Sequence, residues 1–223
     1  MIPRELVGVA EVPGGSPLRL FRHDGDFMIV LDRDELMSSR MSGSEAALGA
    51  MTCGRLRSPA DGRLLIGGYG MGFTLRAVLA QLGPSARIEV AELVPEIIEW
   101  ARGPMQALAD GCLDDPRVEV VIDDVAGVIA AAKASYDAIL LDVDNGPDGL
   151  TIAANDRLYT SRGLQAARAA LRPGGILAVW SAGADAAFTK RLKACGFAVE
   201  EVRVRARENG KGPQHTLWFA TKS

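Results

Sequence analysis

The stretch RLLIGGYGMGF, residues 63–73, is the starting point for reading this chain. A short apolar run enters four glycines, a helical segment follows, and a second apolar run ends on an acid, Glu92. Glycines let a backbone turn sharply and approach a ligand closely, and the helix that follows directs free N–H groups toward the loop. Glu92 is placed to accept hydrogen bonds from a ribose. The order predicts a strand–loop–helix–strand unit with a site for a nucleoside-containing cofactor.

Strands and helices alternate through the rest of this region. The predicted strands are 64–67, 87–91, 117–122, 136–141 and 176–181, and the predicted helices are 71–82, 94–109, 125–134, 160–171 and 184–194. Two further strands, 197–206 and 214–221, flank an Asn-Gly turn, which is typical of a hairpin. We therefore expect an α/β fold with a doubly wound, mostly parallel sheet of the AdoMet-dependent methyltransferase type, ending in an antiparallel hairpin.

The N-terminal part has a different pattern. Two alternating runs around an Asp-Gly pair predict a hairpin over residues 18–31, preceded by a strand near Leu6–Val12. A helix is expected at Glu45–Cys53. The predicted organisation is a small β region with a helix over residues 1–57 and a transferase domain over residues 63–223.

Composition excludes several classes of protein. The chain has 223 residues, is 48% hydrophobic and carries 25 basic against 28 acidic residues, a net charge of −3. This balance implies no general attraction to nucleic acid or to anionic membranes. We see no leader-like segment and no apolar run near ~20 residues. The three cysteines form no CxxC pair and the two histidines have no metal-ligand spacing, so we expect a cytoplasmic protein without a metal site.

Glycines or acids follow four consecutive predicted strands. In an open α/β sheet the ligand lies at these carboxyl ends. The candidate cofactor-binding residues are Gly67, Gly68, Tyr69, Gly70, Gly72, Glu92, Leu93, Asp123 and Asp124, and the candidate catalytic residues are Asp142 and Asp144. Tyr69 and Tyr159 are candidates for the pocket wall. Asp124 is equally suited to cap the helix that follows it.

The order of these segments resembles a known family. The blocks IGGYGMGFTLR, VAELVPEIIEWAR, DDPRVEVVIDD, YDAILLDVDNGP and ALRPGGILAVW resemble the spermidine synthase (aminopropyltransferase) family over roughly residues 63–181. The resemblance implies a methyltransferase-like Rossmann fold behind a small β-domain. It also implies a ribose acid at Glu92, an adenine-side acid at Asp124, a catalytic acid at Asp142 and a habit of forming dimers.

The chain departs from the family at the amine side of the site. Gly70 stands where the family carries an Asp that holds the amine of decarboxylated AdoMet, and the loop after Asp142 is altered. Ser42-Gly43-Ser44-Glu45 stands roughly where the family has a Tyr-His/Gln-Glu segment. A charged amine without a partner in a closed site is costly. Gly70 therefore favours plain AdoMet and methyl transfer, while the resemblance favours decarboxylated AdoMet and aminopropyl transfer.

Three functional hypotheses follow. The first is a spermidine synthase-like transferase that moves an aminopropyl or methyl group from AdoMet or decarboxylated AdoMet to an amine-type small molecule, with Asp142 orienting and deprotonating the amine. The second is a non-catalytic, nucleoside-binding or dimeric scaffold. The third is a NAD-dependent oxidoreductase, disfavoured because Phe73 takes the place of the last glycine of GxGxxG. The β hairpins and the family's habit of forming dimers favour a homodimer.

Overall fold

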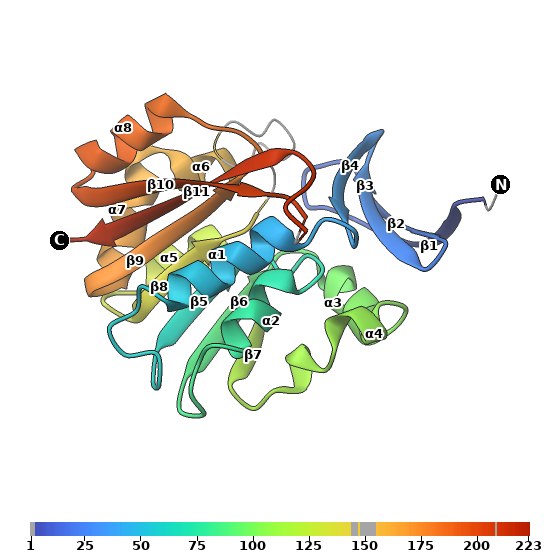
Figure 1. Cartoon of the computed structure of the whole chain (residues 1–223), viewed down its shortest axis with the longest axis horizontal. Coiled ribbons are helices and arrows are strands. Elements are labelled where there is room, and N and C mark those ends of the chain that lie inside the picture. Colours follow the sequence, from blue (N-terminus) through green and yellow to red (C-terminus); the bar gives the residue numbers. More distant parts are fainter. Residues whose placement is uncertain (1–2, 144–146, 148–154, 208) are drawn as a thin grey trace.

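The computed structural model describes residues 3–143, 147, 155–207 and 209–223, and in them a small sheet stands beside a larger α/β unit (Figure 1). The small sheet is antiparallel, in the order β1 (Glu5–Ala10), β2 (Leu18–His23), β3 (Asp26–Leu31) and β4 (Asp34–Ser38). Asp24 and Gly25 join β2 to β3 with φ values of 50° and 84°. Positive φ at both turn residues is the geometry that suits a tight hairpin, so the predicted hairpin is confirmed.

The larger sheet has seven strands in the order β10-β11-β9-β8-β5-β6-β7. Their bounds are β5 (Arg63–Gly67), β6 (Arg87–Glu92), β7 (Val118–Ile122), β8 (Tyr136–Leu141), β9 (Leu171–Ser181), β10 (Phe197–Arg205) and β11 (Gln214–Lys222). The strands from β9 to β7 are parallel, while β11 runs antiparallel to both β9 and β10. The predicted fold class is therefore confirmed, with β11 inserted between β9 and β10.

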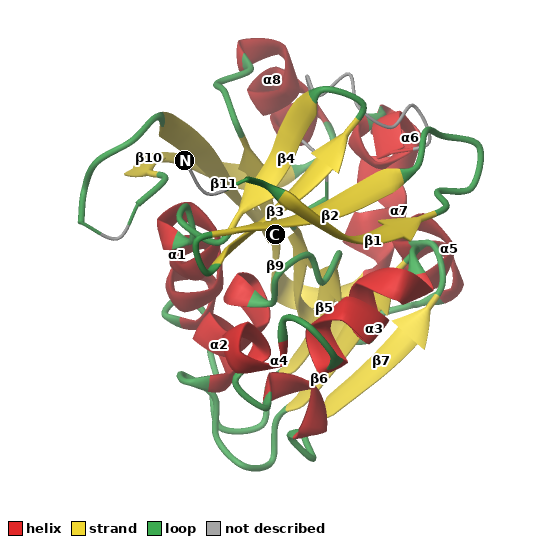
Figure 2. Ribbon diagram, turned by 90° about the vertical axis from the view of Figure 1, so that its right-hand side faces the viewer, coloured by secondary structure: helices red, strands yellow, loops and turns green. Residues whose placement is uncertain are grey.

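Helices cover both faces of this sheet (Figures 1 and 2). They are α1 (Gly43–Cys53), α2 (Phe73–Leu79), α3 (Pro95–Arg102), α4 (Gln106–Ala109), α5 (Val125–Ala131), α6 (Asp156–Tyr159), α7 (Ser161–Ala170) and α8 (Ala186–Ala194), with a 3₁₀ turn at Cys112–Asp114. Alternation along β5 divides the core, since Leu64 and Ile66 pack with α1 and α2, while Leu65 packs with α5 and α7. This is the pattern of a strand buried on both faces.

Several predicted boundaries were wrong for local reasons. Gly72 has a φ of 77°, so α2 begins at Phe73 and not at residue 71. The predicted helix 94–109 is split into α3 and α4 at Gly103, because the residue before a proline is disfavoured in helical geometry. β9 begins at Leu171, earlier than residue 176, and shifts register around Gly174, whose φ is 75°. β4 had no counterpart among the predicted elements.

Two close approaches fix the N-terminal segment onto the larger unit. A Cβ on Gly8 of β1 would lie 2.5 Å from Nε1 of Trp100 in α3, so the small sheet packs directly on that helix. A Cβ on Gly49 would lie 2.7 Å from the carbonyl oxygen of Thr74, so α1 packs tightly on α2. Helix α1 thus packs on the larger unit, and the division between residues 57 and 63 stays a prediction.

Candidate active site

The candidate site lies where the strand order reverses. From β5 the chain passes to β6 and β7 on one side, and then returns to β8 and β9 on the other. The N–H of Asp142, just after β8, donates to the carbonyl of Gly67 at 3.0 Å, which joins the two strand ends. Ligands of open α/β sheets bind at such switch points.

A cavity opens at these strand ends, beneath the small sheet. It contains about 960 Å³ of space not filled by atoms, its open mouth included. Leu18, Ile29, Leu36 and Met37 of the small sheet line one side. The predicted site residues that line it are Gly68, Gly70, Glu92, Leu93, Asp124 and Asp142.

Three alternating glycines shape the loop between β5 and α2. Gly68, Gly70 and Gly72 have φ values of 83°, 56° and 77°, a region that side chains rarely adopt. A Cβ on Gly68 would lie 2.7 Å from the carbonyl oxygen of Asp142. The loop therefore lets the ends of β5 and β8 approach each other. At Gly68 glycine is required both by the positive φ and by the close carbonyl of Asp142. Gly67 and Gly72 are outside the residues that line the cavity in the described part of the chain.

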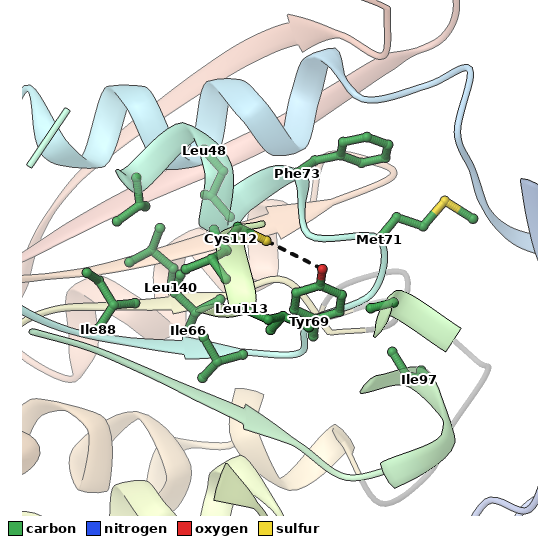
Figure 3. Packing of buried hydrophobic residues seen from close by; sticks show 14 of the residues in the cluster. Leu48, Ile66, Tyr69, Met71, Phe73, Ile88, Ile97, Cys112, Leu113 and Leu140 are labelled. Carbon is green, nitrogen blue, oxygen red and sulfur yellow. Dashed lines mark hydrogen bonds between the residues drawn. The ribbon is translucent and has the colours of Figure 1, made fainter. Parts of the chain in front are cut away.

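The Tyr69 side chain is not placed as expected. Its ring is buried in the core and its hydroxyl lies 3.5 Å from Sγ of Cys112 (Figure 3). The same hydroxyl lies against Gly72, where a Cβ would be 2.7 Å from it. Position 69 is flanked by glycines with positive φ, which turn the side chain inward and leave its backbone N–H for Glu92. Tyr159 is also buried, and its hydroxyl donates to the carbonyl of Val143 at 3.3 Å. Neither tyrosine is among the described residues that line the cavity.

Glu92 is a buried acceptor at the end of β6. Its side chain is 5% exposed, one oxygen accepts from the N–H of Tyr69 at 2.9 Å, and the other accepts from the N–H of Val94 at 2.9 Å. Burial raises the pKa of Glu92, while these N–H groups act in the opposite direction. Glu92 also lines the cavity, so its carboxylate faces a ligand bound there. The residues at this point fit the ribose of a nucleoside.

Asp124 caps α5, as the alternative reading expected. One of its oxygens accepts from the N–H of Ala126 at 2.8 Å, and the other pairs with Arg157. Asp124 also lines the cavity, so a contact with adenine stays a prediction. Asp123 is exposed and accepts from the N–H of Asp124 at 2.7 Å, which makes it a turn residue in this structure.

Asp142 lies at the end of β8 in the centre of the site. The hydroxyl of Thr74 lies 2.5 Å from Oδ2 of Asp142 and 3.2 Å from the carbonyl oxygen of Glu45. Burial raises the pKa of Asp142 to about 6, against the effect of the Thr74 hydrogen bond. When Asp142 is protonated, it can donate to the Thr74 hydroxyl, which then donates to the backbone carbonyl of Glu45. The Thr74 hydroxyl therefore has a hydrogen-bond partner in both protonation states of Asp142. The second predicted catalytic residue, Asp144, lies outside the described residues.

Residues that the sequence did not single out complete the site. Glu45 of α1 lines the cavity and is 7% exposed. Burial, and then the charge of Asp142, raise the pKa of Glu45 to about 7. The Ser44 hydroxyl donates to Glu45 at 2.6 Å and lies 2.8 Å from Nδ1 of His215 on β11. When Glu45 is ionised, the Ser44 proton points to Glu45 and His215 donates to the Ser44 oxygen; when Glu45 is protonated, the chain of hydrogen bonds can run the other way.

His215 was expected to be an ordinary polar residue beside a turn. It is instead buried, its pKa is lowered by burial, and its ring packs edge-on against Trp180 with centroids 4.7 Å apart. The signal for Glu45 was its place near the family's Tyr-His/Gln-Glu segment. For His215 the sequence carried no such signal.

Met37 occupies the space beside Gly70. A Cβ on Gly70 would lie 2.7 Å from Cε and 2.9 Å from Sδ of Met37, which reaches over from β4. The place where the family carries an acid is therefore filled by a thioether. This contact joins the small sheet to the glycine loop.

Within the described ranges, no group of three or more His, Cys, Asp or Glu residues could hold a metal ion. The cysteines Cys53, Cys112 and Cys195 are buried and form no disulfide. Among the helices that the structure describes, none has both the length and the apolar character that crossing a membrane requires.

Comparison with known proteins agrees with this geometry. The family model of the spermine/spermidine synthase domain matches residues 55–191. A polyamine aminopropyltransferase of Mycobacterium tuberculosis is 37% identical over 119 residues, which is 52% of this chain and 22% of that protein. Polyamine aminopropyltransferase 1 of Hyperthermus butylicus is 34% identical over 155 residues, 68% of this chain and 51% of that protein. The matches thus span between about a fifth and a half of these relatives' length.

Solved structures show the same fold over nearly the whole chain. Spermidine synthase from Thermotoga maritima superposes with a TM-score of 0.73 and 21% identity, covering 98% of this chain and 72% of that one. A spermidine synthase in complex with the transition-state analogue AdoDATO gives a TM-score of 0.76 and 22% identity, covering 96% and 74%. With the family model matching more than half of its length, this chain belongs to the spermine/spermidine synthase family.

Proposed function

We propose that this chain is an aminopropyltransferase that uses decarboxylated AdoMet as donor and an amine, of the polyamine class, as acceptor. The observation that carries the proposal is the meeting of Glu92, the glycine loop and Asp142 at one cavity. Glu92 offers the acceptors that a ribose diol needs, and Asp142 supplies a carboxylate where the transferred group would lie. The names of the relatives support the same reaction class.

The reaction needs little beyond positioning and removal of one proton. The acceptor arrives as an ammonium ion and gives one proton to Asp142, which frees the nitrogen lone pair. That nitrogen attacks the methylene carbon next to the sulfonium, so the C–N bond forms while the C–S bond breaks. Sulfur keeps the electron pair, and the products are methylthioadenosine and a secondary ammonium ion. Because sulfonium is already an activated leaving group, alignment in the cavity supplies most of the acceleration.

Methyl transfer from AdoMet is the second candidate, and Met37 is the observation that favours it. The thioether beside Gly70 offers no charge to the ammonium of an aminopropyl chain. A donor amine at that place would lose hydration without gaining a partner. A methyl group needs no such partner.

Calorimetric titration and turnover together test the proposal. We expect methylthioadenosine to bind, and decarboxylated AdoMet to support transfer to 1,4-diaminobutane with release of methylthioadenosine. Methyl transfer from AdoMet, with no product from the decarboxylated donor, would replace the first proposal by the second. Absence of binding by all three nucleosides would refute both. Assembly as a homodimer and a cytoplasmic location stay predictions, which sedimentation and cell fractionation would check.

A further inference from the structure

We propose that Glu45 is a second carboxylate of the acceptor site, which binds the charged amine together with Asp142 and is held in place by Ser44 and His215. The inference rests on the proposed function and names the group that recognises the acceptor's charge.

The other carboxylates of the cavity already have partners. Four described carboxylates line it, from Glu45, Glu92, Asp124 and Asp142. Glu92 accepts two backbone N–H groups, and Asp124 caps α5 and pairs with Arg157. Among the described residues, neither Glu45 nor Asp142 forms an ion pair. The Glu45 carboxylate accepts from the Ser44 hydroxyl, and the Asp142 carboxylate accepts from the Thr74 hydroxyl. These two carboxylates remain for a cationic ligand.

The two carboxylates influence each other within a buried space. The charge of Asp142 opposes ionisation of Glu45, and burial acts in the same direction on both. Two like charges in a poorly solvated site are unfavourable unless a cation compensates them. An ammonium ion has three N–H donors and can bond both carboxylates at once. Binding of a protonated amine would therefore relieve the repulsion that the empty site contains.

The backbone holds Glu45 rigidly relative to Asp142. Gly49 allows α1 to pack on α2, and Thr74 of α2 contacts both the carbonyl of Glu45 and the carboxylate of Asp142. Ser44 and His215 then fix the Glu45 carboxylate from the side of β11. Such locked supporting contacts keep a binding group within the geometry it needs.

The test compares Glu45→Gln with the unmodified protein, using decarboxylated AdoMet and 1,4-diaminobutane. We expect the KM for the diamine to rise at least about tenfold, because a charged hydrogen bond is lost. The dissociation constant of methylthioadenosine, an uncharged nucleoside, should stay within about twofold, since Glu92 holds that part of the ligand. Glu99→Gln, on the exposed face of α3, makes the same chemical replacement outside the cavity and should alter neither quantity.

The outcomes separate the two proposals. An unchanged diamine KM in an active Glu45→Gln protein would overturn the role of Glu45 alone. Equal losses of diamine and methylthioadenosine affinity would also overturn it, because a merely structural role affects both. If Glu45→Gln does not fold, Glu45→Asp withdraws the charge by one methylene and gives the same comparison. An unmodified protein that binds no nucleoside would instead refute the proposed function.

Discussion

An acid restored at position 70 should strengthen binding of decarboxylated AdoMet most when Met37 is also removed. In Gly70→Asp the new Cβ would lie 2.7 Å from Cε of Met37, so the thioether must move. The backbone itself accepts aspartate, because a φ of 56° is in the left-handed region where Asp is tolerated. Because Cε and Sδ are the far end of a flexible side chain, this shift is cheap, and we expect the substitution to cost about 1 kcal/mol of unfolding free energy, at the low end for overpacking.

A double-mutant cycle measures this contact. Met37→Ala alone should cost about 1–2 kcal/mol, because the side chain is only half-buried. In the double variant the space left by Met37 accommodates the acid, so the loss of unfolding free energy should be about 0.5–1 kcal/mol smaller than the sum of the two single losses. Urea unfolding followed by circular dichroism, with equal slopes for all four proteins, gives these values.

The same variants test recognition of the donor. The double variant should bind decarboxylated AdoMet about 10–100-fold more tightly than the unmodified protein, which is the effect of a charge-assisted hydrogen bond of about 1.5–3 kcal/mol. Gly70→Asn with Met37→Ala has the same shape without the charge and should show no such gain. If Gly70→Asp is as stable as the unmodified protein and the cycle shows no coupling, Met37 does not fill this space and the reasoning fails.

Three further predictions concern the acids of the site. Asp142→Asn should lower kcat about 100–10,000-fold and leave methylthioadenosine binding unchanged, and full turnover by the variant would contradict the role of Asp142 as a base. In the unmodified protein, kcat/KM should rise as pH passes about 6, the pKa of Asp142. Glu92→Gln turns an NH₂ group toward the N–H of Tyr69 or Val94 and removes a ribose acceptor. Calorimetry should therefore find methylthioadenosine bound about 10–100-fold more weakly. Unchanged affinity would exclude the ribose contact. The folded protein holds the proton of Glu45 up to about pH 7, whereas the unfolded chain loses it near pH 4.5. The contribution of Glu45 to the free energy of unfolding therefore falls as pH rises between these two values. Relative to the unmodified protein, Glu45→Gln should thus gain up to about 3 kcal/mol on going from pH 4 to pH 8, measured by urea unfolding at both, and a pH-independent difference would refute the raised pKa.

Much of the fold was predictable because its signals are local. Apolar runs, glycine turns and the Asn-Gly pair determine strands and hairpins within a few residues. The predicted hairpin left open which of its two strands lies at the edge of the sheet, although the sequence carried a signal. QHTLWFATK has the uninterrupted apolar run LWFA at its centre, typical of a strand covered on both faces, while FAVEEVRVR of β10 mixes charged and apolar residues, which is typical of an edge. The order of strands in the sheet follows from this contrast.

The site was less predictable because it depends on distant pairings. Glu92 and Asp142 could be predicted, since strand ends meet at one edge of a parallel sheet. Ser44 and His215 are 171 residues apart, and no local pattern joins them. The inward turn of Tyr69 and the reach of Met37 depend on the loop's backbone and on how the small sheet packs, which propensity does not determine.

The insertion of β11 between β9 and β10 affects how the sheet can be assembled. β11 follows all the other described strands in the sequence, yet β10, at the edge, pairs with β11 alone. The sheet therefore cannot grow strand by strand in the order of synthesis, and β10 must wait for the residues that come after it. The pairing of β11 with β9 passes over β10 in the sequence, and such non-local pairings slow folding. In pulsed hydrogen exchange during refolding, we expect the β10 amides to gain protection together with those of β11, and with them the histidine that completes the Glu45 site.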